Sequence, residues 1–170
     1  MNSALSSREK APDRARIALR IKMLTTRWMP PDLALLLLRI WVGQEFLFAG
    51  YTKLSSGLHA PAWFAGLNFP PPLAWMPVDL NWIMAGAGEL IFSVALILGV
   101  WGRLAACGLL IITYVAIHTV HFDLGWAGWN QIETESGLGF KVPLMLAVML
   151  AALIAQGTGR LSLQQTRSHP

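Results

Sequence analysis

The stretch LALLLLRIWVGQEFLFAGYTKL, residues 33–54, has the length and composition of a membrane-spanning helix but contains three ionisable side chains. About 20 mostly apolar residues are enough to cross the ~30 Å hydrocarbon core of a bilayer. Arg39, Glu45 and Lys53 interrupt this run. An ionisable group in hydrocarbon is costly unless it pairs, becomes neutral or turns into the protein interior. The stretch therefore predicts a helix of a membrane bundle with a polar interior.

The composition of the whole chain supports a membrane protein. Of its 170 residues, 55% are hydrophobic and 13% are charged, and the mean hydropathy is +0.51. In the fourth apolar window the uninterrupted part starts only after Lys141, so either this lysine reaches outward or the helix is short. We predict an all-α integral membrane protein, a four-helix bundle with spans at Leu33–Leu54, Leu80–Trp101, Leu104–His121 and about Leu138–Gln156.

The cations are distributed asymmetrically about the predicted spans. By the positive-inside rule, the side that carries the excess of lysine and arginine is cytoplasmic. Both termini are therefore predicted to be cytoplasmic, in a multi-pass protein of the bacterial inner membrane. The basic residues behind the net charge of +4 are then attracted to anionic lipid of the inner leaflet. The bilayer is therefore the expected partner, and no nucleic acid is expected. Ten of the thirteen cations lie on this side: Arg8, Lys10, Arg14, Arg16, Arg20, Lys22, Arg27, Arg103, Arg160 and Arg167.

Three regions follow from this pattern. Residues 1–31 form a cytoplasmic basic arm, in which 13–28 read either as an amphipathic helix on the inner leaflet or as a disordered positive arm. Residues 32–163 form the transmembrane domain, and 164–170 form a cytoplasmic tail. The outer loop 55–79 is rich in proline and aromatic residues, so we expect it to fold over the bundle, either as a lid over a pocket or as an interfacial anchor.

The first span carries a stripe of cations and glycines on one face. At 100° per residue, its members lie within about 40° of a common line. Glycines at such positions let a second helix approach closely. We therefore expect this face to be buried in the bundle, with Glu45 pointing about 120° away from it. The stripe consists of Arg39, Gly43, Phe46, Gly50 and Lys53.

Two glutamates lie deep in the predicted spans. Glu45 and Glu89 are each nine residues inside the outer end of a span, which predicts that their carboxyls lie at the same level near the midplane. Three interpretations stay open. Arg39 could pair with one of them to fix the helix register. The carboxyls could line a polar pocket or proton path beside a lipophilic substrate such as a quinone. They could also contact lipid head groups.

The third span places Cys107, Tyr114, His118 and His121 on one face. His118 is a candidate proton relay, but two histidines without a further cluster predict no metal site. The chain has a single cysteine, so any dithiol chemistry would need thiols from a partner. We find no phosphate-binding glycine-rich loop and no HExxH motif, which argues against the chemistry of soluble enzymes.

The order of these residues resembles the DoxX/DoxD family of four-helix membrane proteins. The first span has the pattern R-x3-G-x2-F-x3-G-x2-K, and the second has E-x9-G-x3-R, formed by Glu89, Gly99 and Arg103. The ending GTGRLSL, residues 157–163, is also similar to that of the family. An aspartate often follows this ending in the family, and here Gln164 takes its place. The resemblance covers residues 33–163.

This resemblance implies a membrane subunit of a quinone-linked oxidoreductase that handles thiols or sulfur, such as a subunit of thiosulfate:quinone oxidoreductase. Glu89, which the resemblance carries over, and Glu45, which its depth in the first span suggests, are candidates for proton exchange. Arg39, Lys53 and Arg103 are candidate binding residues. No covalently bound cofactor is expected, although a quinone is possible. The alternative is a non-catalytic membrane anchor or scaffold that holds a partner oxidoreductase through the basic arm.

Overall fold

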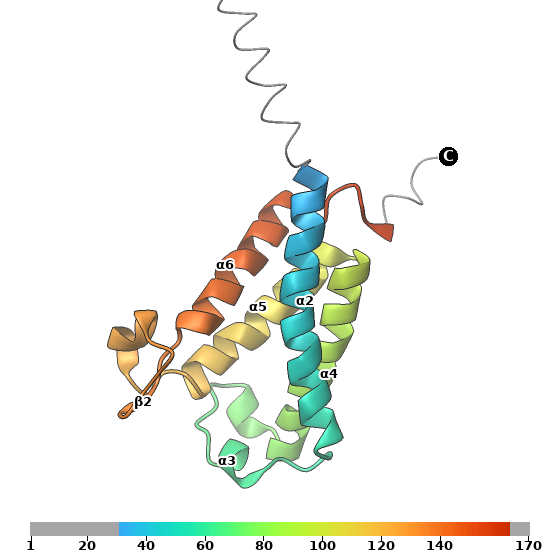
Figure 1. Ribbon diagram of the computed structural model, residues 1–170. Helices are drawn as coiled ribbons and strands as arrows, with labels where there is room; N and C mark the ends of the chain where they lie inside the picture. The colour runs from blue at the N-terminus through green and yellow to red at the C-terminus, as the bar shows by residue number, and fades with distance from the viewer. Residues whose placement is uncertain (1–30, 164–170) are drawn as a thin grey trace, which may run out of the picture.

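A computed structural model of the chain describes residues 31–163 and shows a bundle of four helices (Figure 1). The basic arm up to residue 30 and the tail 164–170 lie outside the described residues. The two ends of the described chain lie at the same end of the bundle. The elements are α2 (Pro31–Ser55), α3 (Ala62–Ala65), η1 (Leu73–Trp75), α4 (Val78–Leu98), α5 (Gly102–Thr119), η2 (Gly125–Asn130), the antiparallel strands β1 (Glu133–Thr134) and β2 (Gly137–Leu138), and α6 (Lys141–Gln156).

The helices confirm the predicted all-α membrane bundle, with one shorter member. In the described part of the chain, α2, α4 and α5 are long and apolar enough to cross a membrane. α6 has 16 residues, which corresponds to about 24 Å. The prediction that the fourth span starts at Leu138 is wrong, because Leu138 pairs with Glu133 in the short hairpin and the helix begins at Lys141. The fourth helix is therefore short, as one of the two sequence interpretations expected.

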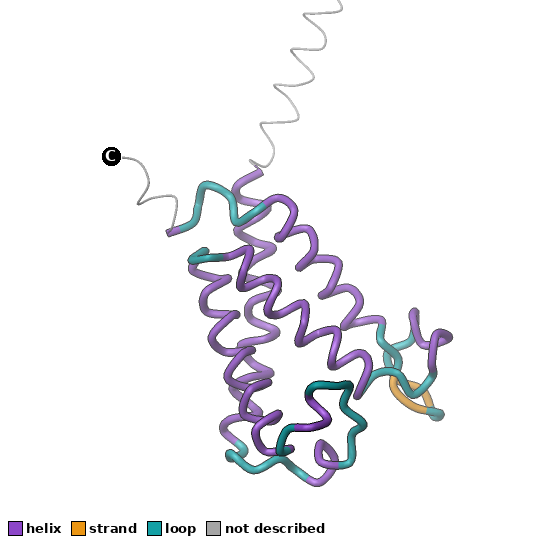
Figure 2. The backbone as a smooth tube through the Cα atoms, turned by 180° about the vertical axis from the view of Figure 1, so that it is seen from behind, coloured by secondary structure: helices purple, strands orange, loops and turns teal. Residues whose placement is uncertain are grey.

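α2 packs along α4, while α5 lies between α4 and α6 (Figure 2). Glycines allow α2 and α4 to approach each other closely. A Cβ atom on Gly50 would lie 2.7 Å from the carbonyl oxygen of Gly86, and one on Gly86 would lie 3.0 Å from the side chain of Leu54. The predicted buried face of α2 is confirmed, because each of its members except Lys53 is buried.

The register of α2 and α4 differs from the prediction. Gly50 faces the backbone between Gly86 and Leu90, which places Glu89 level with Gly50. Glu45 lies five residues deeper along α2, or about 7 Å. The prediction of equal depth is wrong because α4 begins eight residues before Gly86, and thus projects beyond the outer end of α2.

At the inner end, α4 stops earlier than the predicted boundary at Trp101. Gly99 adopts a left-handed conformation with φ of 72° and caps the helix. A Cβ atom on Gly99 would also collide with Arg39 Nη1 and with the side chain of Ser162. Glycine is therefore required here both by backbone conformation and by close packing. Figure 1 shows the segment after α6 returning to this end of α2.

Candidate functional site

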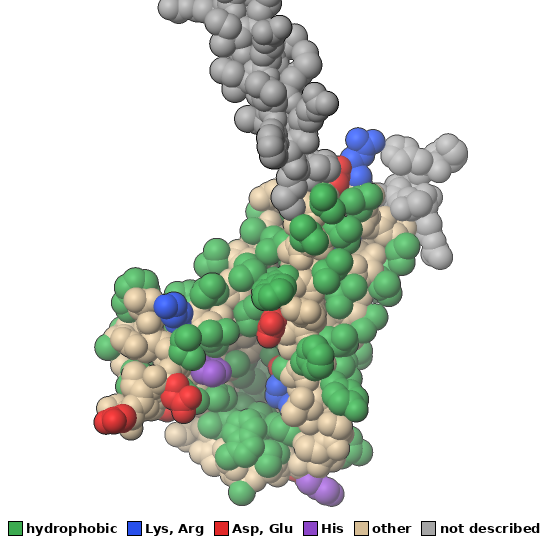
Figure 3. Space-filling view, in the orientation of Figure 1, with side chains coloured by type: hydrophobic (Ala, Val, Ile, Leu, Met, Phe, Trp, Pro, Cys, Tyr) green, Lys and Arg blue, Asp and Glu red, His purple; other side chains and the backbone are tan. Residues whose placement is uncertain are grey.

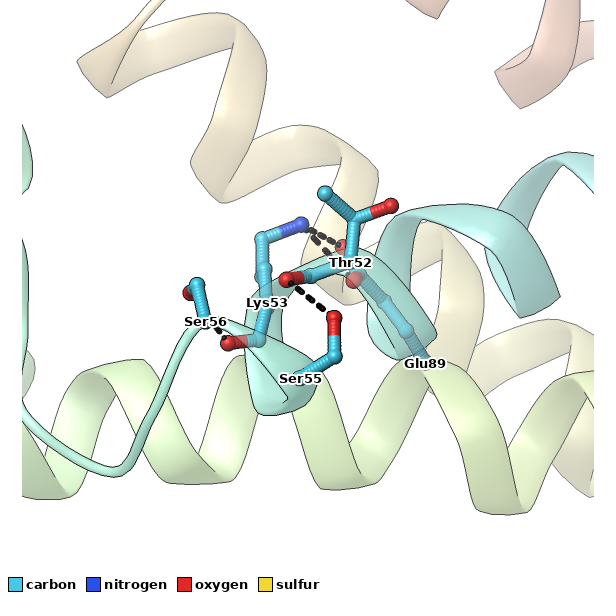
Figure 4. Close-up of polar contacts among 5 residues, drawn as sticks. All are labelled: Thr52, Lys53, Ser55, Ser56 and Glu89. Carbon is cyan, nitrogen blue, oxygen red and sulfur yellow. Dashed lines mark hydrogen bonds and ion pairs between the residues drawn. The ribbon is translucent and has the colours of Figure 1, made fainter.

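An ion pair joins the outer parts of α2 and α4. Lys53 Nζ lies 2.8 Å from Glu89 Oε1 and 2.7 Å from Glu89 Oε2 (Figure 4). The side chains are 21% and 7% exposed. The close approach of the helices at Gly50 and Gly86 brings these two residues together. Both carboxylate oxygens of Glu89 therefore accept from a single ammonium group.

Of the three open interpretations, the one in which Arg39 pairs with a glutamate is contradicted, because neither ion pair found in residues 31–163 includes Arg39. Arg39 is 1% exposed, and its Nη2 donates to the carbonyl oxygen of Leu161 at 2.7 Å. Arg39 belongs to the inner end of α2, whereas Lys53 is the cation that lies level with Glu89. Glu45 is exposed on α2 and forms no ion pair with another residue in 31–163.

A cavity of about 360 Å³ lies beside the ion pair, between α4, α5 and the loop that connects α2 to α4. Figure 3 shows a hollow on this face of the molecule, walled largely by hydrophobic side chains. This volume is within the range of small-molecule sites, which are mostly apolar with a few polar groups that orient the ligand. The polar or ionisable residues that line it are Lys53, Asn81, Glu89, Thr119 and His121.

Aromatic side chains of the α2–α4 loop cover the outer side of this cavity. Phe64 is buried, and its ring centroid lies 4.9 Å from that of Trp82 and 5.1 Å from that of Phe69. The loop is attached to α4, because Asn81 Nδ2 donates to the carbonyl oxygen of Leu73 at 2.9 Å. The expectation that the loop folds over the bundle is confirmed, and Trp63, Phe64, Phe69 and Leu73 line the cavity beneath it.

Two buried polar atoms of lining residues lack a hydrogen-bond partner within the described chain. They are Asn81 Oδ1 and His121 Nδ1. Burial lowers the pKa of His121, although a hydrogen bond to the backbone of Gly139 and the charge of Asp123 act in the opposite direction. Burial therefore favours the neutral form of the His121 imidazole. Buried polar groups are normally hydrogen-bonded, so these atoms are candidates to contact a bound molecule or water.

The residues that line the cavity differ in part from the site residues predicted from the sequence. His118 is exposed and is not part of the cavity wall, whereas His121, one turn later, lines it. Asn81 also lines the cavity, and its signal in the sequence is a single asparagine at the start of an apolar span. Arg103 lies at the inner end of the bundle, so the three predicted binding residues do not form one site. No group of three or more metal-ligating side chains was found among residues 31–163.

Comparisons with known proteins agree with this architecture. The DoxX family profile matches residues 34–122, which include most of α2 and all of α4 and α5 and so carry the cavity wall. An uncharacterized protein of Haemophilus influenzae is 39% identical over 132 residues, which are 76% of this chain and 80% of that protein. No solved structure matches the chain.

Proposed function

Since this chain belongs to the DoxX family of membrane proteins, we propose that it is the membrane subunit of a quinone-linked oxidoreductase, with the quinone ring bound in the outer cavity. The observation that carries this proposal is the Lys53–Glu89 ion pair in the wall of a largely apolar cavity. An intramembrane ionisable pair beside a cavity is a functional-site hypothesis by default. A flat, lipophilic ring with polar oxygens at its edges matches such a wall.

Glu89 and Lys53 have distinct tasks in this proposal. Reduction of a quinone takes up two electrons and two protons, and the reverse reaction releases them. Glu89 accepts or supplies a proton at a ring oxygen, while Lys53 stabilises the carboxylate form by its two hydrogen bonds. The aromatic cover of Trp63 and Phe64 limits the access of water from the outer side.

Electrons come from a partner protein or directly from a substrate. The single Cys107 cannot form an intramolecular disulfide, so thiol chemistry requires sulfur from outside the chain. A sulfur-oxidising or thiol-handling oxidoreductase is the class of partner that fits this requirement.

A second candidate function is a non-catalytic scaffold for such a partner. The observation that favours it is Glu45, which is exposed near the middle of α2 and has no ion-pair partner within 31–163. An ionised carboxylate in contact with lipid is unfavourable by several kcal/mol, and a helix of a partner that supplies a donor would remove this penalty. The basic arm that the scaffold hypothesis also uses lies outside the described residues.

Quinone binding can be tested with the purified chain in detergent. Trp63 lines the cavity, so a short-chain benzoquinone or naphthoquinone should quench tryptophan fluorescence saturably. Ala116→Phe fills the cavity and should abolish the saturable component. Ala151→Phe, on an exposed position of α6, is the matched control and should bind as the natural chain does.

The role of the ion pair is tested by two measurements: quinone binding in the quenching assay, and quinone-linked turnover in membranes that contain the electron donor and a quinone pool. Glu89→Gln keeps the shape of the side chain but removes the proton-accepting carboxylate, so it should abolish quinone-linked turnover while binding is retained. Glu45→Gln lies outside the cavity and should leave binding unchanged. Equal quenching in Ala116→Phe and in the natural chain would show that the quinone does not bind in this cavity.

A further inference from the structure

A second concave surface lies at the opposite end of the bundle, where the first turn of α5 meets the segment that follows α6. This inner groove has a volume of about 790 Å³. Two arginines, Arg103 and Arg160, line it, and no carboxylate is among the described residues of its wall. Neither arginine forms an ion pair with a residue in 31–163. The groove therefore combines two positive charges with no lining anion to neutralise them.

The wall of the inner groove is held in place by hydrogen bonds behind it. The N–H of Arg160 donates to Asp32 Oδ1 at 2.7 Å, and Arg39 Nη2 donates to the carbonyl oxygen of Leu161 at 2.7 Å. On the other wall, Thr158 packs directly against Gly102. Asp32, the nearby acid, thus contacts the backbone of Arg160 and is not part of the groove lining.

The chemistry of the groove fits a phosphate group. Arginine stays charged at all accessible pH values, and its planar donors match phosphate oxygens. The N-terminus of α5 lies at the same place, because Gly102 and Arg103 of its first turn belong to the groove wall. The N–H groups of a helix N-terminus favour an anion.

Apolar side chains beside the two arginines indicate a lipid rather than a free ion. Trp101, Leu104 and Leu161 are exposed at this end of the molecule, and Trp101 and Leu104 also line the groove. Tryptophan is favoured at the membrane interface. The predicted topology places this end at the cytoplasmic leaflet, where anionic phospholipids attract basic residues.

We propose that the inner groove binds the phosphodiester of an anionic phospholipid, with Arg103 and Arg160 on the phosphate and Trp101 and Leu104 beside the first part of the acyl chains. This site is independent of the quinone proposal, because it shares no lining residue with the outer cavity. Basic pockets between membrane helices on the cytoplasmic side are a recognised type of lipid site.

The test measures lipid retention by native mass spectrometry of the purified full chain. Phosphatidylglycerol and phosphatidylcholine with the same acyl chains are titrated in detergent. The natural chain should retain one phosphatidylglycerol and little phosphatidylcholine. The double variant Arg103→Gln/Arg160→Gln should lower the affinity for phosphatidylglycerol at least tenfold, since a hydrogen bond to a charged group contributes roughly this factor or more.

A matched control separates the groove from general charge attraction. Arg14→Gln/Arg16→Gln removes the same charge from the basic arm and should leave the retained lipid in place. Both arginines of the groove are exposed, so the groove variant should keep the unfolding temperature of the natural chain without lipid. Equal loss in the two double variants, or none in the groove variant, would overturn the proposal.

A third arm distinguishes a lipid from a free anion. Inorganic phosphate at millimolar concentration should leave the retained phosphatidylglycerol in place and should not raise the unfolding temperature of the natural chain. Displacement of the lipid by phosphate at that concentration would assign the groove to a soluble phosphate and overturn the lipid proposal.

Discussion

The two cations on the buried face of α2 have opposite surroundings. Arg39, near the inner end, is almost completely buried, gives one hydrogen bond to the carbonyl of Leu161, and has two guanidinium nitrogens without a partner in the described chain. Lys53, near the outer end, is partly exposed and bonds both oxygens of Glu89. One cation therefore contacts chain backbone, and the other contacts a carboxylate in a cavity wall.

This difference separates a packing role from a chemical one. Around Arg39, the end of α4 at Gly99 and the returning segment at Ser162 come together, and each was part of the motifs that suggested the family. Around Lys53, the polar pair borders open volume that a ligand can occupy. Two cations on one helix face thus have different roles: Arg39 packs the inner end of the bundle, and Lys53 forms part of a cavity wall at the outer end.

The largest expected effect is that of Lys53→Met. It leaves the Glu89 carboxylate buried without its cation, and breaking a buried pair in this way destabilises a protein by about 3–5 kcal/mol. Arg39→Met should destabilise less, because within residues 31–163 the buried guanidinium makes one hydrogen bond, to the carbonyl oxygen of Leu161. The measurement is the free energy of unfolding of each variant in a detergent and denaturant mixture.

The control for this prediction restores charge balance. Lys53→Met/Glu89→Gln removes both charges and should recover most of the stability that Lys53→Met loses, while quinone-linked turnover stays absent. If the double variant is as unstable as Lys53→Met, the destabilisation comes from lost packing of the lysine stem and the distinction between the two cations fails.

The second prediction compares two glycines of the same helix face. A Cβ on Gly50 would lie 2.7 Å from the carbonyl oxygen of Gly86, which is backbone and cannot move aside without separating the helices. At Gly43 a Cβ would instead meet the flexible side chain of Ile97. We expect Gly50→Ala to destabilise by about 2–3 kcal/mol and Gly43→Ala by about 1 kcal/mol, the range of overpacking effects. Equal losses in a thermal unfolding series would contradict the close approach at the outer end.

Sequence reasoning predicted the architecture and the buried face of α2, because hydrophobic length and helical periodicity depend on local spacing. The cations and glycines of that face are where the pattern placed them. Glu89 was a functional candidate from its depth in the second span and Lys53 from the family resemblance, but neither argument predicted that the two side chains pair.

The Lys53–Glu89 pair depends on how far α4 is shifted along α2, and the sequence pattern does not contain this shift. Glu89 was placed at the depth of Glu45 by counting from assumed outer ends, but α4 projects beyond α2, so Glu89 reaches Lys53 instead. Similarly, whether His118 or His121 faces the cavity depends on where α5 ends, at Thr119, and on the path of the chain after it. Register and loop path are set by contacts between distant segments, which a periodic pattern does not contain.

A smaller effect is expected at the inner end from Asp32→Ala. The variant loses the acceptor for the N–H of Arg160, a contribution of about 1 kcal/mol. The effect should be local, with faster tryptic cleavage after Arg160 and no change in cleavage after Lys141 at the outer end. Asp32→Asn keeps an acceptor oxygen and should cleave at nearly the natural rate. Faster cleavage in both variants would show that the charge of Asp32 matters rather than its hydrogen bond.

The smallest effect concerns the pH dependence of the outer end. Burial lowers the pKa of His121 below its value in the unfolded chain, about 6.5. Above pH 7 the imidazole is neutral in both states and contributes nothing to the slope. As the pH falls through about 6.5, the unfolded chain takes up a proton that the folded chain does not, so stability decreases until the folded pKa is passed. We expect stability to fall between pH 7 and 5, and His121→Gln should remove this loss. Glu89→Gln shares the cavity wall but should retain this loss, and a slope that persists in His121→Gln would assign the titration to another group.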